Sequence, residues 1–175
     1  MSELFPVLRG KAWLLGDNIS TDVVSPGPYV HAPMAERLRH VLEAVRPDFA
    51  SGVRDGDIVV GGRNFGVGSS RESAPQHLKD LGVAVVVAQS FSRIFARNAI
   101  AIGLPVLTCQ GIGGLVQDGE TVAVDVVSGE VVLSDGTALQ AERIPPEMLT
   151  VLARGGIVPM LRAIAVAAAV SGDAR

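Results

Sequence analysis

The sequence predicts a mixed α/β fold, a mixed sheet with flanking helices and an added antiparallel β layer. Residues 57–108 follow the order strand, helix, strand, helix, strand, which is the order of a parallel α/β unit. The continuous apolar run at 83–88 is typical of a strand buried on both faces. Residues 120–139 instead alternate apolar and polar side chains between turn sequences, which predicts an antiparallel meander.

Three elements are expected before residue 57. Residues 11–15 (KAWLL) are predicted to form a short strand that ends at a turn over 16–18. Residues 20–30 are expected to be irregular, because they contain two prolines and a glycine. From 33 to 45 the apolar residues recur at helical spacing, and Pro47 closes the pattern.

The helix that follows the glycine-rich segment is expected to begin at Ser73. Ser73 would cap it, Pro75 would then lie in its first turn, and Gln76 would reach back to the cap. A start at Ser69, with Glu72 completing a capping box, would place Pro75 inside the helix, where its missing N–H destabilises. The remaining elements are expected to be strands at 57–61 and 104–108 and helices at 91–102, 145–154 and 157–169.

Composition limits the class of protein. The 175 residues, 48% of them hydrophobic, fit one domain over residues 1–175 with a core of its own. The net charge of −3 and the scattered basic residues argue against nucleic-acid binding. Cys109 is the single cysteine, so a disulfide within the chain and an all-cysteine iron–sulfur site are both excluded.

Neither end of the sequence indicates a membrane protein. The N-terminus lacks the apolar core of a signal peptide. The apolar stretch at 157–170 carries Arg162 and is shorter than the roughly 20 residues that span a bilayer. A soluble cytoplasmic protein is therefore expected.

The clearest functional signal is the segment 61–75, GGRNFGVGSSRESAP. It lies between a strand and a helix, so backbone N–H groups, two hydroxyls and a guanidinium should gather at the positive end of a helix dipole. This predicts a site for a carboxylate or a phosphate. The planar fork of Arg71 matches a carboxylate, and a hydroxyl held by N–H donors could act as a base. The plainer alternative is that Ser69 and Ser70 cap a helix and that Arg71 pairs with Glu72.

Other chemistries fit less well. The glycines lack the third member of a dinucleotide fingerprint, and no Gly-Lys-Ser/Thr follows them. His31, His40 and His77 do not share metal-ligand spacing, so no metal site is expected. No serine of the segment lies in a Gly-x-Ser-x-Gly elbow. The polar stretch 17–22 is a second candidate segment, although alone it would be an ordinary loop.

Three segments together resemble one known family. They are GDNISTDVVSPGPYV (16–30), GGRNFGVGSSRESAP (61–75) and QSFSRIFARNAIAIGLPVL (89–107). The chain is similar over roughly residues 11–165 to the isopropylmalate dehydratase small subunits, the stand-alone swivelling domains of the aconitase family. The resemblance implies a swivelling β/β/α domain that closes over a large subunit. That partner would carry a [4Fe–4S] cluster, and this chain would bind no cofactor itself.

The resemblance also implies a reaction and a set of site residues. The family reaction is dehydration and rehydration of a hydroxy di- or tricarboxylic acid through an alkene, here expected to convert 2-isopropylmalate to 3-isopropylmalate in leucine biosynthesis. Carried over by motif, Ser69 is the catalytic base and Arg71 binds a substrate carboxylate. Asp22 lines the site, and Gly68 and Ser70 join it as substrate-binding residues.

The chain departs from the family pattern at several positions. Val67 replaces a cysteine, Ser73 a histidine and Pro28 an arginine, and the residues at 30–33 lie in a stretch associated with side-chain selection. These changes leave the substrate open. A paralogous dehydratase for homoaconitate, dimethylmalate or methylcitrate is one alternative, and a non-catalytic binding module is another.

Overall fold

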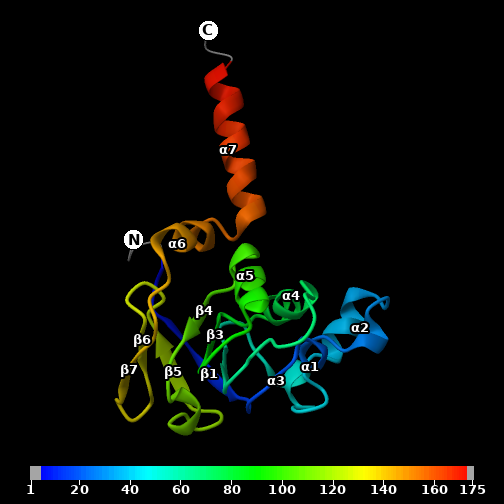
Figure 1. Cartoon of the computed structure of the whole chain (residues 1–175), viewed down its shortest axis with the longest axis vertical. Helices are drawn as coiled ribbons and strands as arrows, with labels where there is room; N and C mark the ends of the chain where they lie inside the picture. Colours follow the sequence, from blue (N-terminus) through cyan, green and yellow to red (C-terminus); the bar gives the residue numbers. More distant parts are fainter. Residues whose placement is uncertain (1–4, 173–175) are drawn as a thin grey trace.

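The computed structural model describes residues 5–172 and contains one seven-stranded sheet in the order β4-β3-β2-β1-β5-β6-β7 (Figure 1). The strands are β1 (Leu8–Leu14), β2 (Ile58–Gly61), β3 (Val85–Ala88), β4 (Val106–Thr108), β5 (Thr121–Val124), β6 (Glu130–Val132) and β7 (Ala138–Gln140). The α-helices are α1 (Thr21–Val24), α2 (Met34–Arg39), α3 (Phe49–Gly52), α4 (Ser73–Asp80), α5 (Arg93–Ala101), α6 (Pro146–Ala153) and α7 (Ile157–Gly172). Two 3₁₀ turns, η1 (Gly27–Tyr29) and η2 (Ile112–Gly114), complete the fold.

The parallel half of the sheet is formed by β1 to β4 and is buried on both faces. Alternate residues of β2 enter different cores: Val59 packs with Trp13, Phe65 and Phe95 on one face, and Ile58 packs on the other. The prediction of a fully buried strand within 83–88 is therefore confirmed. The apolar run has no polar alternation because helices or loops cover each side.

The antiparallel half extends the same sheet from the other edge of β1. Strand β5 pairs antiparallel with β1, and β6 and β7 follow as a meander. Gly129 and Gly136 have φ values of 79° and 86° in its turns, a backbone conformation that glycine adopts at low cost. The predicted mixed α/β class is confirmed, with its antiparallel part hydrogen-bonded to the parallel part.

Two expectations for the region before residue 57 are wrong. The helix predicted over 33–45 is limited to α2, because the chain turns through Leu42 at φ 61° and so buries both Val41 and Leu42 completely. The segment expected to be irregular contains α1, which Ser20 caps by accepting a hydrogen bond from the N–H of Val23 at 3.1 Å. The prolines lie beyond α1 and do not prevent it.

The expectation for the start of α4 is confirmed in part. Pro75 lies in the first turn and residues 69–71 stay outside the helix. However, Ser73 is the first helical residue and Glu72 is the N-cap, without a side-chain cap bond. The Ser73 hydroxyl lies 3.0 Å from the Ser25 hydroxyl instead, and the Gln76 amide donates to Asp80 at 2.7 Å.

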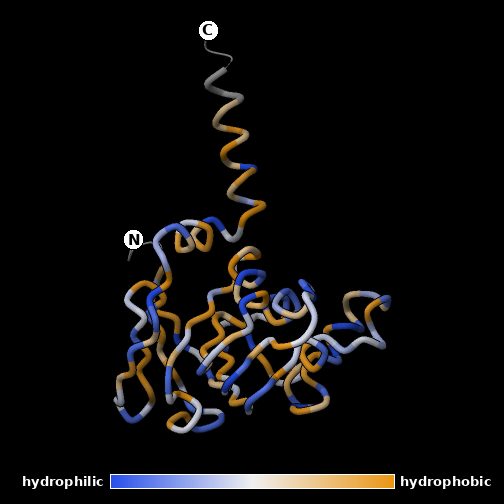
Figure 2. Tube along the Cα trace, viewed as in Figure 1, coloured by the Kyte–Doolittle hydropathy of each residue, from blue (hydrophilic) through white to orange (hydrophobic). Residues whose placement is uncertain are grey.

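The last helix, α7, extends away from the rest of the molecule (Figure 1), and the coloured part of its trace is mostly hydrophobic (Figure 2). Leu161 and Ile164 remain 56% and 58% exposed. Among the described residues no single helix is long and apolar enough to span a membrane; α6 and the part of α7 up to residue 168 pass that test only as a pair bent by 80°.

Candidate functional site

The two candidate segments of the sequence lie side by side in the structure. The loop after β1 and the loop after β2 leave the same edge of the sheet, because β1 and β2 are parallel neighbours. Ligands of open α/β sheets bind at this carboxyl edge. Four backbone hydrogen bonds join the loops: Gly62 to Gly16, Asn18 to Arg63, Gly66 to Ile19 and Thr21 to Val67, at 2.7 to 3.1 Å.

An ion pair and an asparagine pair fix the base of these loops. Asp17 accepts hydrogen bonds from the backbone N–H of Arg63 at 2.8 Å and from its guanidinium at 2.7 and 2.9 Å. These bonds hold the pKa of the Asp17 carboxyl below its usual value. Asn18 and Asn64 both have left-handed backbones, with φ of 57° and 58°, and their side-chain amides join at 2.9 Å.

Two glycines of the turn are required by its geometry. Gly66 has φ 77°, and a Cβ placed on it would lie 2.2 Å from the Cγ of Phe95. Gly68 has φ 117°, and its Cβ would lie 3.1 Å from the Thr21 hydroxyl. The glycines therefore allow the loop to lie against α5 on one side and α1 on the other.

Ser69 is exposed at the tip of this turn, next to a buried threonine. The Thr21 hydroxyl lies 3.2 Å from the Ser69 hydroxyl and donates to the Ser69 carbonyl at 3.2 Å. Within the part of the chain that the structure describes, the N–H groups of residues 68–72 donate no backbone hydrogen bond. Free N–H groups in front of a helix are suited to binding an anion.

Arg71 is held against α1 rather than against its sequence neighbour. Its Nη1 donates to the carbonyl of Ser25 at 2.8 Å, and its Nη2 lies 2.6 Å from Oδ1 of Asp22. The suggested pairing with Glu72 is therefore not the contact that forms. The Arg71 side chain is 31% exposed, so a carboxylate can approach this guanidinium from solvent. Gly68, Ser69, Ser70 and Arg71 lie in the loop after β2, and Asp22 lies on the adjoining helix α1.

Comparison with known proteins identifies the family. The family described as the aconitase C-terminal domain matches residues 40–110. The 3-isopropylmalate dehydratase small subunit 1 of Methanopyrus kandleri is 45% identical over 158 residues, which cover 89% of this chain and 93% of the relative. The chain belongs to the 3-isopropylmalate dehydratase small-subunit family. The resemblance seen in the sequence and the hydro-lyase class that it implies are thereby confirmed.

A solved structure supports the same assignment. The crystal structure of 3-isopropylmalate dehydratase from Methanocaldococcus jannaschii superimposes with a TM-score of 0.88 at 33% identity, over 95% of this chain and 99% of that one. The methanogen homoaconitase small subunit of Methanothermobacter thermautotrophicus is 46% identical over 154 residues, 87% of this chain and 89% of that subunit. The family thus includes relatives whose names indicate different substrates.

The residues that depart from the dehydratase pattern lie at the edge of the site. Val67, in place of a cysteine, is 41% exposed, and its backbone carbonyl accepts from Thr21. Ser73, in place of a histidine, contacts Ser25, whose carbonyl holds Arg71. In the described structure the side chains of Ser69 and Arg71 contact Thr21, Ser25 and Asp22, and bond directly to neither of the replaced residues.

Sequence reasoning missed Thr21 and Ser25 as members of the site. Thr21 is 1% exposed and contacts Ser69, and Ser25 is 4% exposed and binds Arg71 through its carbonyl. The available signal was the sequence Ser-Thr-Asp at 20–22, which is typical of a helix start. A short helix there places its buried face against the glycine-rich loop.

The remaining polar candidates lie apart from this arrangement. His40 stacks on Tyr29 with ring centroids 3.6 Å apart, and His77 is buried within α4. Cys109 is buried, and burial raises the pKa of its thiol. Among residues 5–172, no group of three or more His, Cys, Asp or Glu side chains could hold a metal ion.

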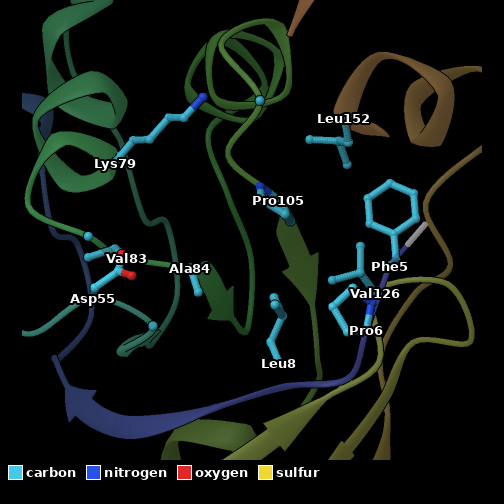
Figure 3. Close-up of a pocket in the computed structure, with 13 residues that line it drawn as sticks. Phe5, Pro6, Leu8, Asp55, Lys79, Val83, Ala84, Pro105, Val126 and Leu152 are labelled. Carbon is cyan, nitrogen blue, oxygen red and sulfur yellow. The ribbon is translucent and has the colours of Figure 1, made fainter. Parts of the chain in front are cut away.

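A cavity of about 480 Å³ lies at the opposite edge of the sheet (Figure 3). Its lining includes Leu8 at the start of β1, Ala84 before β3 and Pro105 before β4. Lys79 lines it too, and its ammonium donates to the carbonyls of Ile102 and Gly155. This amino edge carries none of the candidate residues, so the cavity is not the predicted anion site.

Proposed function

We propose that this chain is the small subunit of a two-chain hydro-lyase that isomerises 2-isopropylmalate to 3-isopropylmalate by dehydration and rehydration. One observation carries the proposal: Ser69 and Arg71 lie on one loop in which the N–H groups of residues 68–72 donate no backbone hydrogen bond. The loop lies beside α1, where Thr21 contacts Ser69 and the carbonyl of Ser25 binds Arg71. The names of the relatives at 42–45% identity support the same reaction.

Ser69 is proposed as the base that takes the proton from the substrate carbon. A serine hydroxyl is a weak base near neutral pH unless its deprotonated form is stabilised by N–H donors and positive charge. The free N–H groups of 68–72 and the guanidinium of Arg71 supply both kinds of stabilisation. Thr21 lies 3.2 Å away and orients the Ser69 hydroxyl.

Arg71 is proposed to bind a substrate carboxylate. The Ser25 carbonyl accepts from one edge of its guanidinium, and the other edge is already paired with a carboxylate, that of Asp22. A substrate carboxylate can take or share that place, because the planar fork offers five N–H donors. Ser70 and Gly68, both exposed beside Ser69, are proposed to line the substrate together with Asp22.

The partner is proposed to be a large subunit that carries a [4Fe–4S] cluster. The cluster would supply Lewis-acid assistance to the departing hydroxyl group when it is bound. The exposure of Ser69, Ser70 and Asp22 supports a site that a second chain must cover, since closure excludes water from the reaction. The cytoplasm, where other biosynthetic enzymes work, is the compartment we expect.

The substrate is tested by reconstitution without oxygen. This chain is purified together with its large subunit, and alkene formation is followed by ultraviolet absorbance with 2-isopropylmalate, dimethylmalate, methylcitrate and homocitrate. Turnover of 2-isopropylmalate that requires both chains supports the proposal. Turnover of homocitrate instead would favour the homoaconitase assignment that the Methanothermobacter relative suggests. A stable complex that turns over none of the four acids would contradict both and favour a binding module.

A further inference from the structure

His77 is a buried histidine without a hydrogen-bond partner. It lies on α4, it is 2% exposed, and neither ring nitrogen bonds to any group of the described structure. A polar group that is buried without a partner loses its hydration and gains no hydrogen bond in exchange, which is unfavourable. An imidazole in that position needs either water or a ligand against it.

A second unpartnered donor belongs to a residue that lines the same cavity as His77. The Nε of Arg37, on α2, is also buried without a partner. Burial, and to a lesser extent the nearby charge of Arg37, holds the pKa of the His77 imidazole below its usual value. Arg37 and His77 both line a cavity of about 240 Å³ between α2 and α4, together with Glu72, Ser73 and Gln76.

We propose that this cavity binds a small molecule through one carboxylate, which accepts hydrogen bonds from Arg37 and His77. The three orphan nitrogens belong to two residues on different helices that line one cavity, and donors on two sides of a cavity suit a bidentate acceptor. None of the cavity residues is a proposed catalytic or substrate-binding residue. The inference therefore goes beyond the proposed reaction and stands whichever acid is isomerised.

The charges around the cavity favour a carboxylate over a phosphate. Arg37 is the one permanent cation among the lining residues, and Glu72 adds a negative charge. A singly charged anion can be neutralised by Arg37, whereas a doubly charged phosphate would keep an unpaired charge beside Glu72. The Gln76 amide already donates to Asp80 and the Ser73 hydroxyl already contacts Ser25, so neither is counted among the groups that would hold the carboxylate.

Occupation of the cavity would connect to the candidate site through Ser73. The Ser73 hydroxyl contacts Ser25, and the Ser25 carbonyl holds Arg71. A ligand that joins α2 to α4 would thus stabilise the segment that positions Arg71. The cavity is suited to a carboxylate metabolite that adjusts activity.

The test is a nuclear magnetic resonance titration of the full-length chain. The side-chain ¹⁵N signals of His77, assigned by their loss in His77→Leu, are followed while propionate or inorganic phosphate is added. We expect a saturable shift with propionate, weakened at least tenfold in Arg37→Gln. Arg39→Gln removes the same charge from an exposed position of the same helix and should bind propionate like the wild type.

Several results would overturn the proposal. Equal binding by wild type and Arg37→Gln would show that Arg37 is not a ligand. If Arg71→Gln abolished the propionate-induced shift of the His77 signals, the propionate would instead bind at the candidate site around Ser69 and Arg71. A saturable response to phosphate alone would contradict the carboxylate class, and no saturable response to either anion would mean that the cavity holds water only.

Discussion

Substitution of Gly66 by alanine should destabilise the chain by both backbone strain and overpacking. Gly66 has φ 77°, which costs a residue with a Cβ roughly 1–2 kcal/mol. The new methyl would lie 2.2 Å from the Cγ and 2.3 Å from the Cβ of Phe95. Phe95 is 1% exposed and packs edge-on to Phe65 with centroids 5.3 Å apart, so it cannot move without disturbing the core. Overpacking of this kind costs about 1–3 kcal/mol.

The two effects together predict a loss of about 2–5 kcal/mol in the free energy of unfolding, measured by urea denaturation followed by circular dichroism. Gly111 provides a matched control, because its φ is 78° but a Cβ there would meet nothing within 4 Å. Gly111→Ala should therefore lose only the backbone part. The difference between the two variants isolates the contact with Phe95. Equal losses in both variants would refute the claim that the turn is seated directly against α5.

Three further predictions concern titratable side chains. Burial and Arg37 lower the pKa of His77, so the unfolded chain binds more protons than the folded chain below pH 6.5. As the pH falls below 6.5, the free energy of unfolding of the wild type should therefore decrease by up to about 1.4 kcal/mol per pH unit relative to that of His77→Leu. Parallel stability curves for the two proteins would contradict this. The pKa of Asp17 is lowered from its ordinary value of 3.8, so its contribution to folding stability is complete above that pH and is lost on acidification. The urea midpoint of Asp17→Asn should therefore differ from that of the wild type at pH 7 and much less at pH 2. An equal difference at both pH values would contradict this. The buried Cys109 thiol should react with Ellman's reagent only after unfolding, and rapid reaction in the native state would show that it is accessible.

The strands and the loop site could be predicted because their signals are local. Apolar runs mark the strands buried on both faces, and a loop that follows such a strand must lie at the carboxyl edge of the sheet. Ser69 and Arg71 were placed there by sequence order alone. The resemblance to the family then suggested their roles, and these roles remain predictions.

The parts that could not be predicted depend on contacts between distant residues. The apolar spacing over 33–45 fits a helix, but the chain buries Val41 and Leu42 through a left-handed residue instead. The side-chain amides of Asn18 and Asn64, which are 46 residues apart, form a hydrogen bond that neither segment predicts by itself. The lack of a hydrogen-bond partner for His77 likewise depends on the residues that pack against α4, and the helical spacing of apolar residues does not specify these.

The most direct test of the proposed catalysis compares two neighbouring serines. Ser69→Ala and Ser70→Ala are each assembled with the large subunit without oxygen, and kcat and KM are measured by alkene absorbance. Loss of a general base predicts a fall in kcat of about 10²–10⁴ for Ser69→Ala with the complex intact, and a smaller effect, mainly on KM, for Ser70→Ala. A normal kcat for Ser69→Ala in an intact complex would contradict the assignment of Ser69 as the base.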